Sequence, residues 1–113
     1  MPSKVIGFTA GAFDLLHPGH LYFISECKNK CDVLWIGLHT DPTLDRPKTK
    51  NKPIQTVFER FYQLLSIQFI DLVIPYDSEY DLQNMMGVLP IQIRFLGSDY
   101  KDKPITGSDI CNK

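Results

Sequence analysis

The sequence has few of the features that mark secreted, membrane-bound or nucleic-acid-binding proteins. Its three cysteines, Cys27, Cys31 and Cys111, form neither a disulfide framework nor a zinc-binding pattern. The first residues do not resemble a signal peptide, and no apolar run is long enough to cross a bilayer. A net charge of -1 gives no general attraction to nucleic acid or to a membrane surface. We therefore expect a cytoplasmic protein that binds neither nucleic acid nor membrane.

The residues that are present suit one small α/β domain spanning residues 1–113, because 43% of them are hydrophobic. Four short, almost continuously apolar segments are typical of strands buried in a parallel sheet: 4–9, 32–38, 72–74 and 91–96. Three segments are expected to be helical: 19–29, 54–69 and 82–88. A polar loop rich in Lys and Pro is expected at 43–53. This order predicts a Rossmann-like, doubly wound, mainly parallel sheet.

The turn after the first expected strand carries the strongest functional signal. It reads Gly11-Ala12-Phe13-Asp14-Leu15-Leu16-His17-Pro18-Gly19-His20 and joins that strand to a helix. Gly11 and Gly19 let a ligand come close to the backbone, and unpaired N–H groups at the start of the helix would attract an anion. His17 and His20 can donate hydrogen bonds to phosphoryl oxygens, where charge develops during transfer. The pattern predicts a site for the phosphates of a nucleotide.

This string is similar to the GTFDLLHxGH motif of the cytidylyltransferase family, a branch of the HxGH nucleotidyltransferase superfamily. The resemblance is closest to the glycerol-3-phosphate cytidylyltransferases. It implies an HxGH-type fold and transfer of CMP from CTP to a phosphorylated alcohol such as glycerol 3-phosphate, with release of pyrophosphate. It further implies Mg²⁺ as cofactor, a homodimer and no covalent intermediate. No residue of the chain is assigned as a metal ligand.

The resemblance also implies roles for single residues. Three are assigned to catalysis: His17, His20 and Lys50. Seven are assigned to nucleotide binding, with the last near the base: Ala12, Phe13, His17, Gly19, His20, Lys52 and Asp99. Three are assigned to the acceptor: Asp14, Lys50 and Arg60.

Several of these assignments have a plainer alternative. Asp14 and Asp99 would then only stabilise turns. The lysines of the loop would be solvated charges, and Lys48 competes with Lys50 for the same role because the loop register is open. Arg60 would be a surface residue paired with Glu59 or Asp41.

The C-terminal part departs from the family pattern. The second signature, RTxGIS(T/S), has no match in residues 104–113, so we expect a domain that is truncated at its C-terminus and a sheet that lacks its last strand. Asp99-Tyr100 and Thr106-Gly107-Ser108 resemble the ADP-heptose synthases instead. Two alternatives to CMP transfer follow. One is an adenylyltransferase similar to ADP-heptose or FAD synthases, and the other is a nucleotide-binding remnant without turnover.

Overall fold

Parallel strands alternate with helices along most of the chain. The computed structural model describes residues 4–44, 47–48 and 52–96 and the backbone of 110–112. The elements run in the order β1 (Ile6–Gly11), α1 (Pro18–Asn29), β2 (Val33–His39), η1 (Pro42–Leu44), α2 (Val57–Leu65), β3 (Leu72–Tyr76), α3 (Glu79–Val88), β4 (Ile93–Phe95) and β5 (Ile110–Asn112). No helix in the described part of the chain is long and apolar enough to span a membrane.

The strands form one sheet in the order β3-β2-β1-β4-β5. β1 to β4 are parallel, which confirms the Rossmann-like α/β fold expected from the sequence. The chain moves from β1 outward to β2 and β3, and then returns to the other side of β1 to form β4. This change of direction creates a topological switch point beside the carboxyl end of β1, where open α/β sheets bind their ligands.

The short strand β5 was not expected, because the sequence analysis placed only polar chain after the fourth strand. β5 pairs antiparallel with β4, with Cys111 opposite Arg94. It covers only three residues, Ile110 to Asn112, which is too short to show a recognisable apolar pattern.

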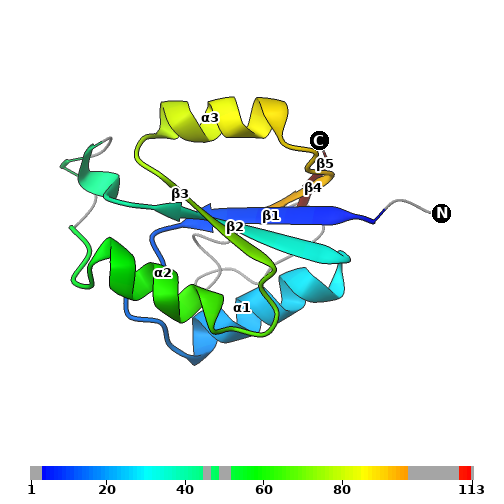
Figure 1. The fold of residues 1–113 in the computed structure, drawn as a ribbon, viewed down its shortest axis with the longest axis horizontal. Helices are drawn as coiled ribbons and strands as arrows, with labels where there is room; N and C mark the ends of the chain where they lie inside the picture. Colours follow the sequence, from blue (N-terminus) through cyan, green and yellow to red (C-terminus); the bar gives the residue numbers. More distant parts are fainter. Residues whose placement is uncertain (1–3, 45–46, 49–51, 97–109, 113) are drawn as a thin grey trace.

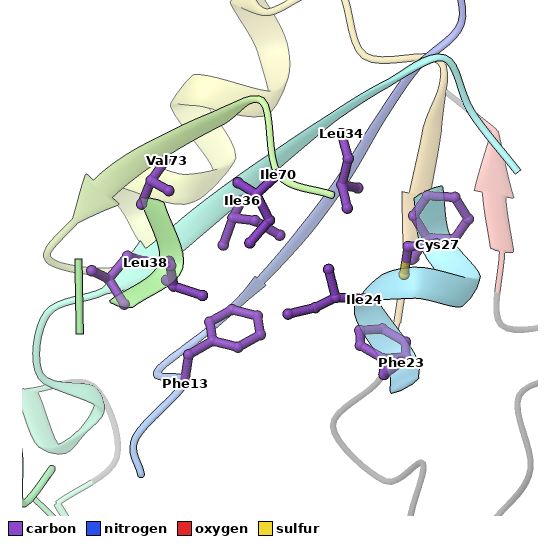
Figure 2. Close-up of a cluster of buried hydrophobic side chains, with 11 residues drawn as sticks. Phe13, Phe23, Ile24, Cys27, Leu34, Ile36, Leu38, Ile70 and Val73 are labelled. Carbon is purple, nitrogen blue, oxygen red and sulfur yellow. The ribbon is translucent and has the colours of Figure 1, made fainter. Parts of the chain in front are cut away.

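The sheet separates two apolar clusters. α1 and α2 cover one face and α3 covers the other (Figure 1). The larger cluster packs Phe23, Ile24 and Cys27 of α1 against Leu34, Ile36 and Leu38 of β2. Figure 2 shows Phe13, from the turn after β1, pointing into this cluster. The turn that carries the sequence motif is therefore anchored in the core by its own side chain.

The second expected helix is shorter than the sequence suggested, with α2 running only from Val57 to Leu65. The Thr56 hydroxyl accepts a hydrogen bond from the Glu59 N–H at 3.1 Å, and the Glu59 carboxylate accepts one from the Thr56 N–H at 2.8 Å. This capping box starts the helix at Val57 and leaves Ile54 and Gln55 outside it. The helical periodicity of the sequence continued beyond Leu65 because Ile67 and Phe69 also pack on the core, although they are not helical.

Candidate functional site

The motif turn lies between the carboxyl end of β1 and the start of α1, at the switch point of the sheet. His39 at the end of β2, and Thr40 and Asp41 after it, reach the same edge of the sheet. Parallel strands bring their carboxyl ends together, so segments far apart in the sequence meet here. This topology places the histidine turn at the carboxyl edge of the sheet, as the sequence predicts; ligand binding at this edge stays a prediction.

His17 and His20 close the start of α1 by capping each other. His17 is the N-cap residue, and its Nδ1 accepts a hydrogen bond from the Gly19 N–H at 3.0 Å. The Nδ1 atom of His20 accepts from the His17 N–H at 3.2 Å. The two rings are tilted by 50°, with their centroids 4.1 Å apart. The pair forms a capping box built from imidazoles instead of a hydroxyl and a carboxylate.

These hydrogen bonds decide which nitrogen of each ring carries the proton. An Nδ1 atom that accepts from an N–H group cannot itself be protonated, so a neutral imidazole must carry its hydrogen on Nε2. By this rule, His17 and His20 in their neutral form both carry the ring hydrogen on Nε2. Two such donors on one turn are suited to hydrogen bonding phosphoryl oxygens.

The expectation of unpaired N–H groups at the helix start is wrong. Pro18 has no N–H, the Gly19 N–H is bonded to His17, and the His20 N–H donates to the His17 carbonyl at 2.9 Å. The backbone of Gly19, which was expected to bind nucleotide, serves the cap. The imidazoles, together with the positive end of the helix dipole, are thus the groups that α1 offers to an anion.

The motif turn adopts an unusual backbone conformation. Phe13 and Leu15 both have φ of 50°, the left-handed region that non-glycine residues seldom occupy. This conformation costs about 1–2 kcal/mol for each such residue. Burial of Phe13, whose side chain is only 8% exposed, helps to hold it. Because the Phe13 side chain belongs to the core, only its backbone is left for the expected contact with a nucleotide.

Asp14 lies between these two residues and binds the segment that precedes α2. Its Oδ2 accepts from the Ile54 N–H at 2.8 Å, and its Oδ1 accepts from the Gln55 N–H at 2.9 Å. In the opposite direction, the side-chain Oε1 of Gln55 accepts a hydrogen bond from the Leu15 N–H at 2.8 Å. Burial alone would raise the pKa of the Asp14 carboxyl, but these N–H donors, aided by the charge of Arg60, outweigh that effect and lower it.

Arg60 is buried, with 1% of its surface exposed. Its Nε donates to the Gln55 carbonyl at 3.1 Å, and its Nη2 donates to the Thr40 carbonyl at 2.6 Å. Its Nη1 donates to the carbonyls of Ala12 at 3.0 Å and His39 at 2.8 Å. Arg60 thus joins the ends of β1 and β2 to the start of α2, and the alternative of a surface arginine paired with Glu59 or Asp41 is wrong. These contacts favour a positioning role over the acceptor contact expected from the resemblance.

Lys52 lies at the same edge but makes a looser contact. Its Nζ is 3.6 Å from Oδ2 of Asp41, and its side chain is 80% exposed. Asp41 is itself fixed by Thr43, whose N–H and hydroxyl donate to Oδ1 at 3.0 and 2.6 Å. The hydrogen bonds from Thr43 lower the pKa of the Asp41 carboxyl, so it is ionised at neutral pH. Lys52 is therefore held at this edge by an exposed ion pair, a kind of contact that contributes little stability.

Two predicted site residues, Lys50 and Asp99, lie outside the described residues. The residues that the structure does bring together at the edge are Ala12, Asp14, His17, His20, Lys52 and Arg60. Sequence reasoning missed Gln55, which it placed on the polar face of a longer helix. The spacing Thr56-x-x-Glu59 could have revealed the true helix start, and with it a Gln55 side chain facing the turn.

The described residues include no group of three or more His, Cys, Asp or Glu that could hold a metal ion. Both carboxylate oxygens of Asp14 already accept from backbone N–H groups. Mg²⁺ commonly binds through substrate phosphates and water with only one or two carboxylates. The described residues therefore offer no ready-made metal cage, and Mg²⁺ stays a prediction of the family resemblance.

Comparison with known proteins identifies the family of the chain. A family model described as cytidylyltransferase-like matches residues 8–110. The chain belongs to the cytidylyltransferase-like family. It is 36% identical over 110 residues to the bifunctional protein HldE of Campylobacter jejuni serotype O:6, and 37% identical over 105 residues to HldE of Caulobacter vibrioides. These matches cover 97% and 93% of this chain but only 24% and 22% of the relatives, so the chain spans about a quarter of their length.

A solved structure described as the lipopolysaccharide core biosynthesis protein of Thermoplasma volcanium has the same fold. Its TM-score is 0.65, and the match covers 76% of this chain and 69% of that protein at 23% identity. Membership of the cytidylyltransferase-like family confirms the resemblance that was drawn from the histidine motif. The family identifies the chain as a nucleotidyltransferase-like domain.

Proposed function

We propose that this cytidylyltransferase-like domain transfers an adenylyl group from ATP to a phosphorylated sugar and releases pyrophosphate. The observation that carries the proposal is the mutually capped pair His17 and His20 at the switch point of the sheet, whose Nδ1 atoms are engaged in the cap so that the ring hydrogens lie on Nε2. The expectation of CTP and glycerol 3-phosphate becomes the weaker alternative. Relatives at 36–37% identity are HldE proteins, which fits an ADP-heptose synthase better than CMP transfer.

The proposed transfer needs no covalent enzyme intermediate. A phosphate oxygen of the acceptor attacks the α-phosphorus of ATP, the bond from the α-phosphorus to the bridging oxygen breaks, and pyrophosphate leaves with the electron pair. Positioning and electrostatic stabilisation supply most of the rate. Mg²⁺ bound to the phosphates would neutralise charge on the leaving pyrophosphate.

The residues of the chain have distinct roles in this proposal. His17 and His20 donate from Nε2 to the phosphoryl oxygens as negative charge grows on them. Lys52, and Lys50 by the family resemblance, hold the phosphates of nucleotide and acceptor. Asp99 stays assigned to the base by resemblance, and the homodimer stays a prediction. Arg60 and Asp14 stabilise the turn through hydrogen bonds to backbone groups and are not assigned a contact with the substrate.

The proposal is tested by calorimetric titration with Mg·ATP and Mg·CTP, followed by an assay of pyrophosphate release. Binding of ATP well above CTP, with pyrophosphate released when a heptose 1-phosphate is added, is the expected result. Turnover of CTP with glycerol 3-phosphate instead would keep the family chemistry and overturn the choice of substrates. A chain that binds neither nucleotide would be the remnant without turnover.

A further inference from the structure

We infer that Asp14 and Gln55 form a reciprocal latch that docks residues 52–55, the end of the lysine loop expected at 43–53, onto the histidine turn and so positions Lys52. This inference rests on the proposed function, because the loop matters only if the turn binds a nucleotide. It changes the meaning of Asp14, which becomes a positioning residue in place of an acceptor-binding one.

The latch is reciprocal in its hydrogen bonds. Each side chain accepts from the main chain of the other segment: Asp14 from Ile54 and Gln55, and Gln55 from Leu15. The three distances lie between 2.8 and 2.9 Å, and the partners are 40 or 41 residues apart in the sequence. A carboxylate that accepts two backbone N–H groups is held in a single orientation. Both carboxylate oxygens of Asp14 are therefore already engaged in hydrogen bonds within the protein.

The latch closes a loop that begins at the same edge of the sheet. The chain leaves β2 after His39 and reaches Asp41, whose Oδ1 accepts a hydrogen bond from the Thr43 N–H in η1. It returns with Lys52 beside Asp41, and two residues later Ile54 meets Asp14. Lys52 is thus tied to the ligand edge by an exposed ion pair on one side and by the latch on the other. An exposed ion pair contributes little, so the latch is the contact that fixes where the loop ends.

The latch also holds the turn itself. Phe13 and Leu15, on either side of Asp14, keep φ of 50°. The Leu15 N–H is held by Gln55 in this conformation. His17 follows two residues later as the N-cap of α1. Loss of the latch would therefore loosen the lysine loop and the histidine turn together, although it removes no group that touches a substrate.

The test compares variants that break the latch with variants that spare it. Asp14→Asn puts an N–H group against backbone N–H donors, and Gln55→Met removes the acceptor for Leu15. Gln55→Glu keeps an acceptor and serves as the conservative rescue. Thr56→Ala removes the neighbouring cap of α2 without touching the latch, so it is the matched control for general loss of stability.

Two measurements are made on each variant. The first is the rate of tryptic cleavage after Lys48 and Lys50, without nucleotide. The second is kcat and KM for Mg·ATP. We expect Asp14→Asn and Gln55→Met each to raise both the cleavage rate and KM by about tenfold, with a smaller change in kcat. The double variant should be no worse than the stronger single one, because both break the same unit. Gln55→Glu and Thr56→Ala should behave like the parent in both measurements.

Two outcomes would overturn the latch. If cleavage followed thermal stability in every variant, Thr56→Ala included, Asp14 would be only a structural residue. If Asp14→Asn lowered kcat with cleavage and KM unchanged, Asp14 would act on the reacting groups. The cleavage assay needs no turnover, so a parent chain that ignores Mg·ATP would refute the proposed function while cleavage still decides the latch.

Discussion

A single histidine, His17, uses its two ring nitrogens for different tasks. Its Nδ1 accepts a hydrogen bond from the Gly19 N–H and caps α1, so the ring hydrogen lies on Nε2. In the proposed function, one ring thus serves both the fold and the reaction. The two tasks can be separated by substitution, because asparagine is also a favoured N-cap residue but has no counterpart of Nε2.

We predict that His17→Asn keeps the stability of the chain and loses transfer activity by about 10²–10³-fold, as expected when one donor to a developing oxyanion is removed. His17→Ala should lose the activity and in addition about 1 kcal/mol of stability, because the cap is lost as well. Urea unfolding and pyrophosphate release measure the two effects. Full activity in His17→Asn would show that Nε2 does not contact the reacting phosphate.

Arg60 is the buried cation on which the carboxyl edge of the sheet depends. Burial lowers the pKa of its guanidinium and the charges of Asp14 and Asp41 oppose this, so the group stays ionised at neutral pH. Its planar fork serves four carbonyls at once. An ammonium group has no such geometry.

We therefore predict that Arg60→Met destabilises the chain by about 3–5 kcal/mol, because buried carbonyls lose their donors. Arg60→Lys should give a smaller but clear loss. Lys52→Met is the control, and because Lys52 is exposed it should stay within about 0.5 kcal/mol of the parent. Urea unfolding at neutral pH makes the measurement. Near-parental stability of Arg60→Met would mean that the carbonyls find water in its place.

At the scale of elements, the sequence predicts the buried strands well and the edges of helices poorly. β1, β2 and β3 are almost continuously apolar, with Thr9 and His39 as their polar or charged interior exceptions. The helix predicted at 54–69 is too long at its C-terminal end, because Ile67 and Phe69 keep a helical spacing although they pack on the core outside any helix.

The same limit applies to the candidate site. The histidine motif could be located from the sequence, because its chemistry is written in consecutive residues. The contacts between Asp14 and Gln55, and between Arg60 and the strand ends, could not, because they join residues 20 to 48 positions apart. Only the folded sheet brings such residues together.

Replacing two glycines in different elements by alanine should change the stability of the chain in opposite directions. A Cβ on Gly37 in β2 would lie 2.6 Å from Cζ of Phe8, inside the core. A Cβ on Gly87 in α3 would meet nothing within 4 Å. Gly37→Ala should therefore cost about 1–3 kcal/mol through overpacking. Gly87→Ala should stabilise the chain by about 0.5–1 kcal/mol, because alanine favours a helix interior. Thermal unfolding of both variants is the test, and shifts of the same sign would contradict the packing described here.

At the scale of the whole molecule, aspartate carboxylates accept backbone hydrogen bonds at both edges of the sheet. Asp14 and Asp41 act at the carboxyl edge, and Asp71 acts at the opposite edge. Oδ2 of Asp71 accepts from Lys28 Nζ at 2.8 Å and from the Leu34 N–H at 2.9 Å. Burial alone would raise the pKa of Asp71, but these two donors outweigh it and lower it below its usual range.

The sign of the pH dependence follows from these lowered pKa values. A carboxylate whose pKa is lower in the folded than in the unfolded chain stabilises the fold above its unfolded pKa of about 4, and loses that effect as the pH falls through its folded pKa. We predict that the melting temperature is steady near neutral pH and falls steeply below about pH 4. Asp71→Asn should melt below the parent at pH 7, and the two should converge at the acid end. Glu26→Gln is the control and should shift stability by less than about 0.5 kcal/mol. A difference between Asp71→Asn and the parent that persisted undiminished below the folded pKa would show that Asp71 acts through packing and not through its charge.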